Sequence, residues 1–294
     1  MPTGIILLDK PQGLTSNGAL QRVRKAYGAK SAGHVGTLDP MATGMLPLCL
    51  DEATKVIAEI EAGGKCYEFT VQLGARTDTG DAEGDIVERQ PVPALEPATI
   101  EQALAHFRGL QTQIPPMYSA LKRNGRPLYE LARQGVEVER APRAIDIRRL
   151  ELVAHRPEAL DLRCECGKGT YIRVLGEDIA RRLGTLGFLT RLRRAWVEPF
   201  RDMPMVSLET ALAGAGDGGL DLLAPDIALQ ALPQARISES QVIALRHGQA
   251  VEAMPDAQVE AGRRVRIYGP EGAFLGMAEV LSDGRLQPRR LIGV

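Results

Sequence analysis

Paired cysteines, long apolar runs and aromatic side chains are scarce in this chain. Its four cysteines are Cys49, Cys66, Cys164 and Cys166, and none has the Cys-x-x-Cys spacing of zinc or redox sites. We therefore predict neither a disulfide nor a metal site. The apolar run near the N-terminus has only five residues and no basic segment before it, which fits neither a signal peptide nor a membrane span. We expect a cytoplasmic protein that does not associate with membranes.

The sequence also lacks the signatures of nucleotide-dependent enzymes and of common hydrolases. It has no G-x-x-x-x-G-K-[ST] loop and no G-x-G-x-x-G after a strand, although Lys10 and Gly13 in LLDKPQG could suggest a phosphate cradle. A G-x-S-x-G elbow and an H-E-x-x-H pair are absent as well. This elimination leaves carboxylate chemistry on a polyanionic partner as the working hypothesis.

The composition is that of an ordinary globular protein. The 294 residues are 44% hydrophobic and 25% charged, and this length predicts one large domain with a smaller appendage. A net charge of −1 argues against a nucleic-acid partner. The charge is segregated, however: residues 117–149 carry eight Lys/Arg against four acids, residues 263–290 six against three, and residues 202–229 five acids and no base. Such segments could form a basic face for phosphates, or they could be solvated helix surfaces.

Strand and helix patterns alternate along the chain without a regular βαβ repeat. We therefore expect an α+β fold with a mixed, largely antiparallel central sheet flanked by helices. Residues 31–47 show neither period and are expected to form a long, ordered loop. Strands are predicted at GIILLDKP, KCYEFTVQLG, 145–155 and 160–166, and helices after Thr15 or Ser16, at 52–61, 97–107 and 127–133, and after GKGTY.

A Gly-rich, acidic stretch, AGAGDGG, resembles a surface connection between domains. We place one domain at residues 1–232, with the basic segment 117–149 as an excursion from it. The second domain is placed at residues 235–294, where short alternating strands are separated by GPEG and DG turns. This predicts a small β-rich C-terminal domain.

Asp39 is the first candidate for chemistry. In GTLDPMATG it precedes a proline and stands between glycines, so the backbone can turn tightly and present the carboxylate in a cleft. The alternative is that Asp-Pro merely initiates a turn. His34 lies in the same segment, and an imidazole could wedge into a base stack where a nucleotide has been extruded. It could equally be a solvated or hydrogen-bonded loop histidine.

Three further side chains could complete such a site. Tyr67 and Tyr171 stand beside charged residues in GGKCYEF and GKGTYIR, where their rings could stack on a nucleobase or be half-buried structural residues. Arg173 could pair with Asp39 and keep it ionised in an enclosed pocket, or it could be an ordinary surface arginine.

These segments resemble bacterial TruB-type tRNA pseudouridine synthases. The motifs LLDKPQG, SAGHVGTLDPMATGMLPLCL, KCYEFTVQLGARTDTGDAEGD, PPMYSALKRNGRPLYELARQG and GKGTYIRVLGEDIARRLG occur in the order expected of that family. The tail, with FLGMAEV and DGRLQPRRLI, is similar to the PUA-like RNA-binding domain of the same proteins. One departure is AWVEP after Arg194, where the family pattern is nearer Thr-x-Ser-Gly, so the local geometry there is left open.

The resemblance implies a pseudouridine synthase fold and conversion of uridine 55 in the tRNA T-loop to pseudouridine. It implies that Asp39 is the catalytic nucleophile, acting at C6 of the base, at C1′ of the ribose or through a glycal. It further implies that Tyr67 stacks on the flipped base, that Arg173 partners the aspartate, and that the substrate is contacted by His34, Tyr171 and Leu192. We add Lys10 as a further candidate substrate contact. No cofactor, metal or protein partner is implied, and we expect a monomer that binds the T-arm of tRNA.

Three alternatives remain at this stage. The chain could be a non-catalytic tRNA-binding or tRNA-folding protein that uses the same surface. It could be a pseudouridine synthase of the guided type, or a glycosidase-like hydrolase. The sequence does not distinguish the cleavage routes open to Asp39.

Overall fold

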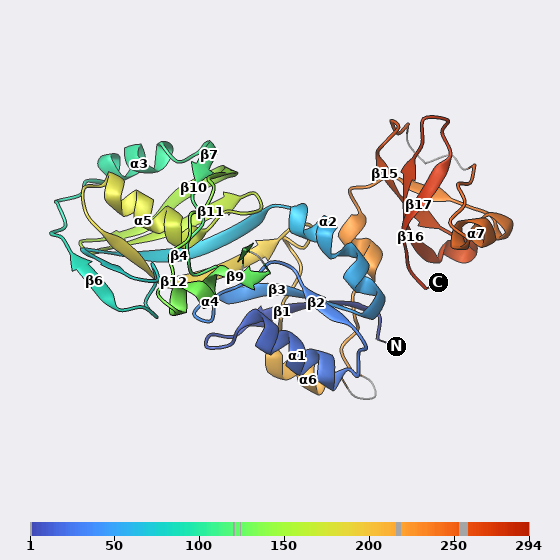
Figure 1. Cartoon of the computed structure of the whole chain (residues 1–294), viewed down its shortest axis with the longest axis horizontal. Helices are drawn as coiled ribbons and strands as arrows, with labels where there is room; N and C mark the ends of the chain where they lie inside the picture. Colours follow the sequence, from blue (N-terminus) through green and yellow to red (C-terminus); the bar gives the residue numbers. More distant parts are fainter. Residues whose placement is uncertain (1, 120, 124, 216–218, 253–257, 294) are drawn as a thin grey trace.

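The chain forms a large body around a nine-stranded sheet and a smaller C-terminal body around a four-stranded sheet (Figure 1). The computed structural model describes residues 2–119, 121–123, 125–215, 219–252 and 258–293. Residues 216–218 of the Gly-rich connection therefore lie outside the described residues. None of the described helices combines the length and the apolar composition that a membrane-spanning helix requires.

The large sheet is mixed and mostly antiparallel, as expected. Its strands are β1 (Gly4–Lys10), β2 (Ala32–His34), β3 (Thr43–Leu50), β4 (Lys65–Leu73), β7 (Gly109–Gln113), β10 (Arg143–Arg156), β11 (Ala159–Cys166), β12 (Gly187–Val197) and β13 (Val206–Ser207). Their order is β13–β1–β3–β12–β4–β11–β10–β7, with β2 paired to β3. Only β1 with β13 and β3 with β12 pair in parallel. The parallel pair β3–β12 joins the two halves of the sheet.

Helices cover one face of this sheet and build the main core. They are α1 (Ser16–Ala26), α3 (Pro97–Ala105), α5 (Ile172–Arg182) and α6 (Leu208–Ala213). The helix α1 begins where expected, because the Thr15 side chain accepts a hydrogen bond from Gly18 N. Leu8, Leu46 and Leu48 are fully buried under these helices, and each such burial stabilises the fold by roughly 1.5–3 kcal/mol.

A second apolar cluster lies on the opposite face of β1 and β3. It includes Ile5, Leu7 and Trp196, and it is covered by η1 (Asp51–Val56), α2 (Ile57–Ala62) and η2 (Pro225–Leu229). The helix expected over residues 52–61 thus begins as a 3₁₀ segment and becomes α-helical at Ile57. The four cysteines are free and buried in these two clusters.

The expected loop at residues 31–47 is shorter than predicted. The strands β2 and β3 take up both of its ends and leave residues 35–42 as the connection. The strand β3 was missed because it is buried on both faces and carries Gly44 and Pro47, so it shows no apolar alternation. The remaining loop is ordered by its own buried side chains, Leu38 and Met41.

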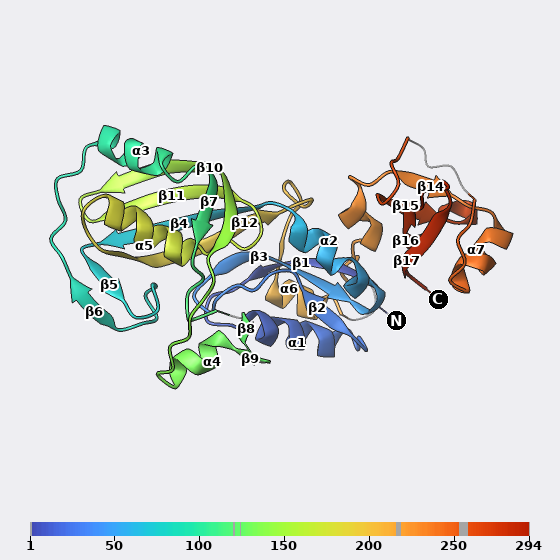
Figure 2. The same ribbon diagram turned by 45° about the horizontal axis from the view of Figure 1, so that its top comes forward.

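The basic segment leaves the sheet after β7 and returns at β10. It contains β8 (Lys122–Arg123), β9 (Arg126–Pro127) and α4 (Leu128–Arg133), which project from the large body (Figure 2). A separate hairpin, β5 (Ala75–Thr77) with β6 (Ile86–Arg89), brackets the acidic loop.

The C-terminal body is β-rich, as expected, but it also holds a helix. Its sheet has the order β14 (Gln234–Arg236), β15 (Arg264–Tyr268), β16 (Phe274–Val280) and β17 (Leu286–Leu291). The additional helix α7 (Glu239–Arg246) begins with a capping box formed by Ser238 and Gln241.

The segment formed by η1 and α2 anchors the C-terminal body to the large body. Lys55 Nζ donates to Leu291 O at 2.7 Å, and the Glu52 carboxylate accepts from Gly293 N at 2.9 Å. Glu59 of α2 pairs with Arg264 of β15. These contacts tie both ends of the C-terminal sheet region to one short helical segment.

Candidate active site

A cavity of about 760 Å³ opens where β4 and β12 meet the 35–42 loop and the start of α5. This is the volume typical of a small-molecule site. Five of the candidate site residues from the sequence line this cavity: Asp39, Tyr67, Tyr171, Arg173 and Leu192. These residues come from four separate segments of the chain and are brought together only by the fold.

The backbone around Asp39 is pinned from both sides. The buried Ser16 hydroxyl donates to Leu38 O at 2.9 Å and accepts from Leu38 N at 2.8 Å. On the other side, Asp39 O accepts from Ala42 N at 3.1 Å and closes a turn. The carboxylate is thereby fixed in direction before any partner binds.

Arg173 holds the Asp39 carboxylate through two nitrogens. Its Nε lies 3.0 Å from Asp39 Oδ2, and its Nη2 lies 3.3 Å from Asp39 Oδ1. The same guanidinium donates to Thr79 O at 2.8 Å and to Tyr118 O at 2.5 Å. Asp81 approaches the Arg173 Nε at 3.5 Å, so two carboxylates share one cation that is only 5% exposed. A planar donor fork is suited to such a crowded contact.

Burial dominates the electrostatics of Asp39. It raises the pKa of this carboxyl above its ordinary value, and the neighbouring Asp81 adds to the rise. The Arg173 and Lys10 charges act in the opposite direction without cancelling it. Asp39 is thus a carboxylate with few solvent partners, while 33% of its side-chain surface is still accessible.

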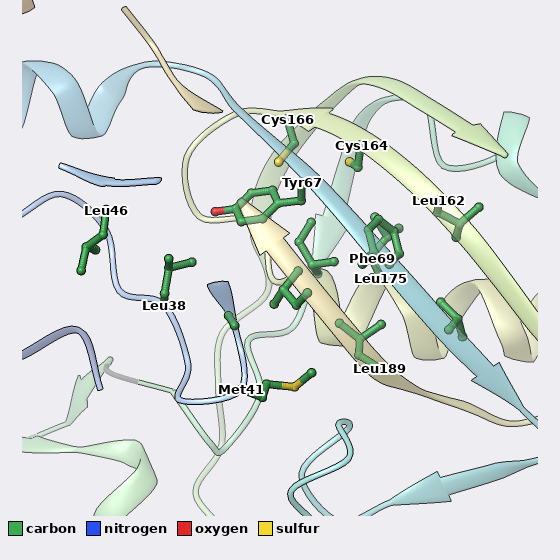
Figure 3. Packing of buried hydrophobic residues seen from close by; sticks show 14 of the residues in the cluster. Leu38, Met41, Leu46, Tyr67, Phe69, Leu162, Cys164, Cys166, Leu175 and Leu189 are labelled. Atoms are coloured by element: carbon green, nitrogen blue, oxygen red, sulfur yellow. The ribbon is translucent and has the colours of Figure 1, made fainter. Parts of the chain in front are cut away.

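Tyr67 forms the wall of the cavity opposite the loop. Its ring is 8% exposed, and burial raises the pKa of the phenol to about 12. Figure 3 shows its hydroxyl directed toward the segment that carries Leu38 and Leu46, away from the rest of the apolar cluster. Leu192 of β12 is 6% exposed and adds an apolar surface beside Tyr67. An aromatic and an aliphatic face therefore border the carboxylate.

Tyr171 stands at the N-cap of α5, two residues before Arg173. Its backbone is clamped by the buried Gln113 amide, which accepts from Tyr171 N at 2.8 Å and donates to Tyr171 O at 3.1 Å. Burial raises the pKa of the Tyr171 phenol as well. The clamp holds the first turn of α5 against β7.

Lys10 and His34 lie outside the cavity lining. Lys10 is fully buried and donates to Leu14 O at 2.7 Å, Pro11 O at 2.9 Å and Pro40 O at 3.3 Å, while burial lowers its pKa to about 8. Its ammonium therefore holds the carbonyls of the loop beside Asp39. His34 ends β2, and its Nδ1 lies 3.1 Å from Gly36 O. Burial lowers the pKa of the His34 imidazole.

The sequence interpretation missed three charged residues at this site. Asp81 shares Arg173 with Asp39, and the cavity wall also contains Lys65 and Arg194. Lys65 lies two residues before Tyr67 on β4 and therefore points to the same face of the sheet. Arg194 lies on the neighbouring strand β12, directly opposite Tyr67 in the strand register. The strand position of Tyr67 could have indicated both. The sequence around Asp81, TDTGDAEGD, contains several acids, and no local pattern singles out Asp81 among them.

The family models and the curated relatives agree. Residues 24–172 match the N-terminal domain of the TruB family pseudouridylate synthases, and residues 233–292 match the TruB C-terminal domain of pseudouridine synthase II. The tRNA pseudouridine synthase B of Stutzerimonas stutzeri (strain A1501) is 48% identical over 99% of this chain and 95% of the relative. The protein of the same name from Aromatoleum aromaticum is 48% identical over 98% of this chain and 92% of the relative.

Solved structures share the fold at lower identity. A chain in the crystal structure of a Cbf5-Nop10-Gar1 complex matches with a TM-score of 0.74 and 24% identity, over 98% of this chain and 84% of that chain. An archaeal box H/ACA sRNP Nop10-Cbf5 complex gives a TM-score of 0.72 at 21% identity, over 98% of this chain and 86% of that chain. At these identities the likeness establishes the fold alone. From the family models and the curated relatives, the chain belongs to the TruB family of pseudouridylate synthases.

Proposed function

We propose that this enzyme isomerises uridine 55 in the T-loop of tRNA to pseudouridine, with Asp39 as its nucleophile. The observation that supports this most directly is the Asp39 carboxylate gripped by Arg173 in a cavity walled by Tyr67 and Leu192. The curated relatives named tRNA pseudouridine synthase B support the choice of substrate.

The reaction exchanges one bond for another within the substrate. The N1–C1′ glycosidic bond breaks, the uracil rotates while it is held, C5 bonds to C1′, and the proton on C5 is lost as N1 gains one. There is no change of oxidation state and no net hydrolysis, so the reaction needs no cofactor. A stacked uridine must first leave the loop, which costs a few kcal/mol.

Each wall residue has a proposed task. Asp39 attacks the nucleoside and forms or assists the cleavage, and Arg173 keeps it aimed and ionised against the effect of burial. Tyr67 stacks on the extruded base, and Leu192 and Tyr171 border it. Rotation of the base needs a slot with flat apolar walls, which Tyr67 and Leu192 provide.

The two residues outside the lining receive different tasks. We propose that Lys10 positions the 35–42 loop through its three carbonyl contacts and does not touch the substrate. His34 serves as a wedge for the space that the extruded nucleotide leaves, because its lowered pKa favours the neutral imidazole at physiological pH. Gly36 O, which faces its Nδ1, orients the ring.

We propose that the chain acts on the T-arm of tRNA as a monomer and without a protein partner. We propose that it works in the cytoplasm, where unbound tRNA is available. We also propose the division into domains at residues 1–232 and 235–294, which the two separate sheets and the family match at residues 233–292 support, with the C-terminal domain adding RNA contacts.

The test replaces one carboxylate oxygen. Asp39→Asn should abolish pseudouridine formation in a bare tRNA transcript while leaving tRNA binding within a few-fold of the wild type. Asp85→Asn, which alters an exposed carboxylate in the acidic loop, is the matched control and should stay active. Pseudouridine at another position, activity only with an added guide RNA, or free uracil as product would each overturn the proposal.

A further inference from the structure

Five basic residues line the active-site cavity, and they divide into two groups. Lys65, Arg173 and Arg194 are buried, whereas Arg143 and Lys168 are exposed at the mouth. The difference matters because a buried cation serves the protein that surrounds it, while an exposed cation can exchange water for an anion.

The buried group already has its partners. Arg173 is shared by Asp39 and Asp81. Lys65 Nζ donates to Glu61 O and Gly63 O, both at 2.9 Å, at the end of α2. Burial also lowers the pKa of Lys65 to about 8.

Arg194 completes this group. Its guanidinium donates to Met45 O at 2.7 Å and to Val35 O at 3.0 Å, and its side chain is only 1% exposed. The three buried cations therefore hold the cavity together and have little capacity for a backbone phosphate.

Arg143 and Lys168 differ from the arginines on the outer face of the sheet, which are paired with acids. On the outer face of β10 and β11, Arg156 pairs with Asp161 and Arg163 with Glu68. Among the residues that the structure describes, neither Arg143 nor Lys168 has an ion pair or a side-chain hydrogen bond.

Both cations flank Tyr171 on rigid supports. Arg143 begins β10 and is the register partner of Gln113, the residue that clamps the Tyr171 backbone. Lys168 lies three residues before Tyr171 in the turn closed by Thr170 Oγ1 and Gly167 O at 3.2 Å. The backbone supports of both cations are thus defined, and both side chains line the same cavity as Tyr171.

We propose that Arg143 and Lys168 form a phosphate-binding pair that holds the RNA backbone next to the extruded nucleotide. The inference rests on the proposed function, since it assigns an RNA backbone to the same cavity. Exposed cations beside an aromatic ring are the arrangement that single-stranded RNA requires, with phosphates on the charges and a base on the ring. Glu61 lines the cavity from α2 and would repel a phosphate, so the strand passes on the Arg143 side.

The first test measures binding of a tRNA transcript by the full-length protein at several salt concentrations. The double variant Arg143→Ala, Lys168→Ala should weaken binding about 10- to 100-fold and reduce the slope of log Kd against log salt by about 1–2, since each lost phosphate contact removes about 0.7–0.9.

Arg163→Ala is the matched control, because Arg163 is paired with Glu68 on the outer face. An unchanged salt slope in the double variant, or an equal change in the control, would overturn the proposal. Circular dichroism of each variant verifies folding. The binding readout is independent of catalysis, so it is informative even if the wild type makes no pseudouridine.

The second test removes the charge from the RNA. A neutral methylphosphonate at each phosphate next to the target uridine should weaken binding to the wild type and to Arg163→Ala. The same RNA should bind the double variant as well as unmodified RNA does. Additive losses from the two changes would mean that these residues and these phosphates do not meet.

Discussion

At the scale of single residues, Asp39, the nucleophile that we propose, meets two opposing requirements. A nucleophile must be ionised, yet burial raises the pKa of this carboxyl despite the guanidinium beside it. Arg173 limits the rise and also fixes the direction of both oxygens. A poorly solvated carboxylate of fixed direction is more reactive than one surrounded by water.

The raised pKa of Asp39 predicts the pH dependence of the reaction. The single-turnover rate should fall on acidification through a midpoint above the ordinary carboxyl value of 3.8, because protonation removes the nucleophile. The stability effect has the same origin: the folded state binds this proton more tightly, so the contribution of Asp39 to stability is lost as pH rises through the folded pKa. Asp39→Asn should therefore gain stability relative to the wild type as the pH rises above the ordinary carboxyl value of 3.8. Rate profiles and urea denaturation measure the two effects, and a rate midpoint at or below 3.8 would contradict the first.

Arg173→Lys keeps the charge but loses the planar fork. One ammonium cannot serve both Asp39 oxygens together with Thr79 O and Tyr118 O, so carbonyls are left without donors. We expect the free energy of unfolding to fall by about 1–3 kcal/mol and the single-turnover rate to fall at least about 100-fold. Arg181→Lys, on the exposed side of α5, is the control. Equal rates for the two variants would show that charge alone suffices.

Residue patterns predicted part of this site. Asp39 was indicated by the Asp-Pro turn, and Arg173 was placed against it by the family motif and now by geometry. Asp81 was not predicted, because it is one of several acids in its segment and only tertiary packing selects it. Lys65 was not predicted either, although its position two residues before Tyr67 on β4 places it on the same face of the strand. The three carbonyl contacts of the Lys10 ammonium were not predicted, because the motif does not encode them.

At the scale of elements, the junction of β1, β3 and β12 depends on Gly44. Its φ is +100°, and a Cβ there would lie 2.2 Å from Arg194 O in the parallel partner strand. Gly44→Ala should lower the free energy of unfolding by about 3 kcal/mol or more, because neither backbone can retreat. Gly28→Ala, also at positive φ but with open space around it, should cost only about 1 kcal/mol. Urea denaturation compares them, and equal losses would refute the close approach as the cause.

Helices and strands whose apolar residues recur at a regular spacing were predicted from the sequence. Elements that lack such a spacing were missed. The helix α1 and the strand β4 have a cap or an apolar alternation and occur where expected. The strand β12 was not predicted, because a bulge near Arg191 breaks its period of two and the buried Arg194 occupies an apolar position. AWVEP, the departure from the family pattern, continues this strand to Val197.

At the scale of the whole molecule, the two bodies are joined by polar contacts on η1 and α2 and by Met277 of β16, which packs into the second apolar cluster of the large body. Lys55→Ala with Arg264→Ala should speed hydrogen exchange at the end of β17 and around α2. Global stability should change by less than about 1 kcal/mol, because partly exposed pairs contribute little. Arg289→Ala, which breaks a pair inside the C-terminal body, is the control. Identical exchange in both variants would mean that these contacts do not hold the bodies together.

The helix α2 has only six residues, yet Glu59 holds the C-terminal body while Ala58, Glu61 and Ala62 border the cavity. Lys65, in the cavity wall, donates hydrogen bonds to Glu61 O and Gly63 O at the C-terminal end of this helix. Replacing the C-terminal body with another RNA-binding domain would thus remove the Arg264 contact that supports α2 beside the cavity. Such a chimaera would need to reproduce the Glu59 anchorage to keep the entrance at its native width.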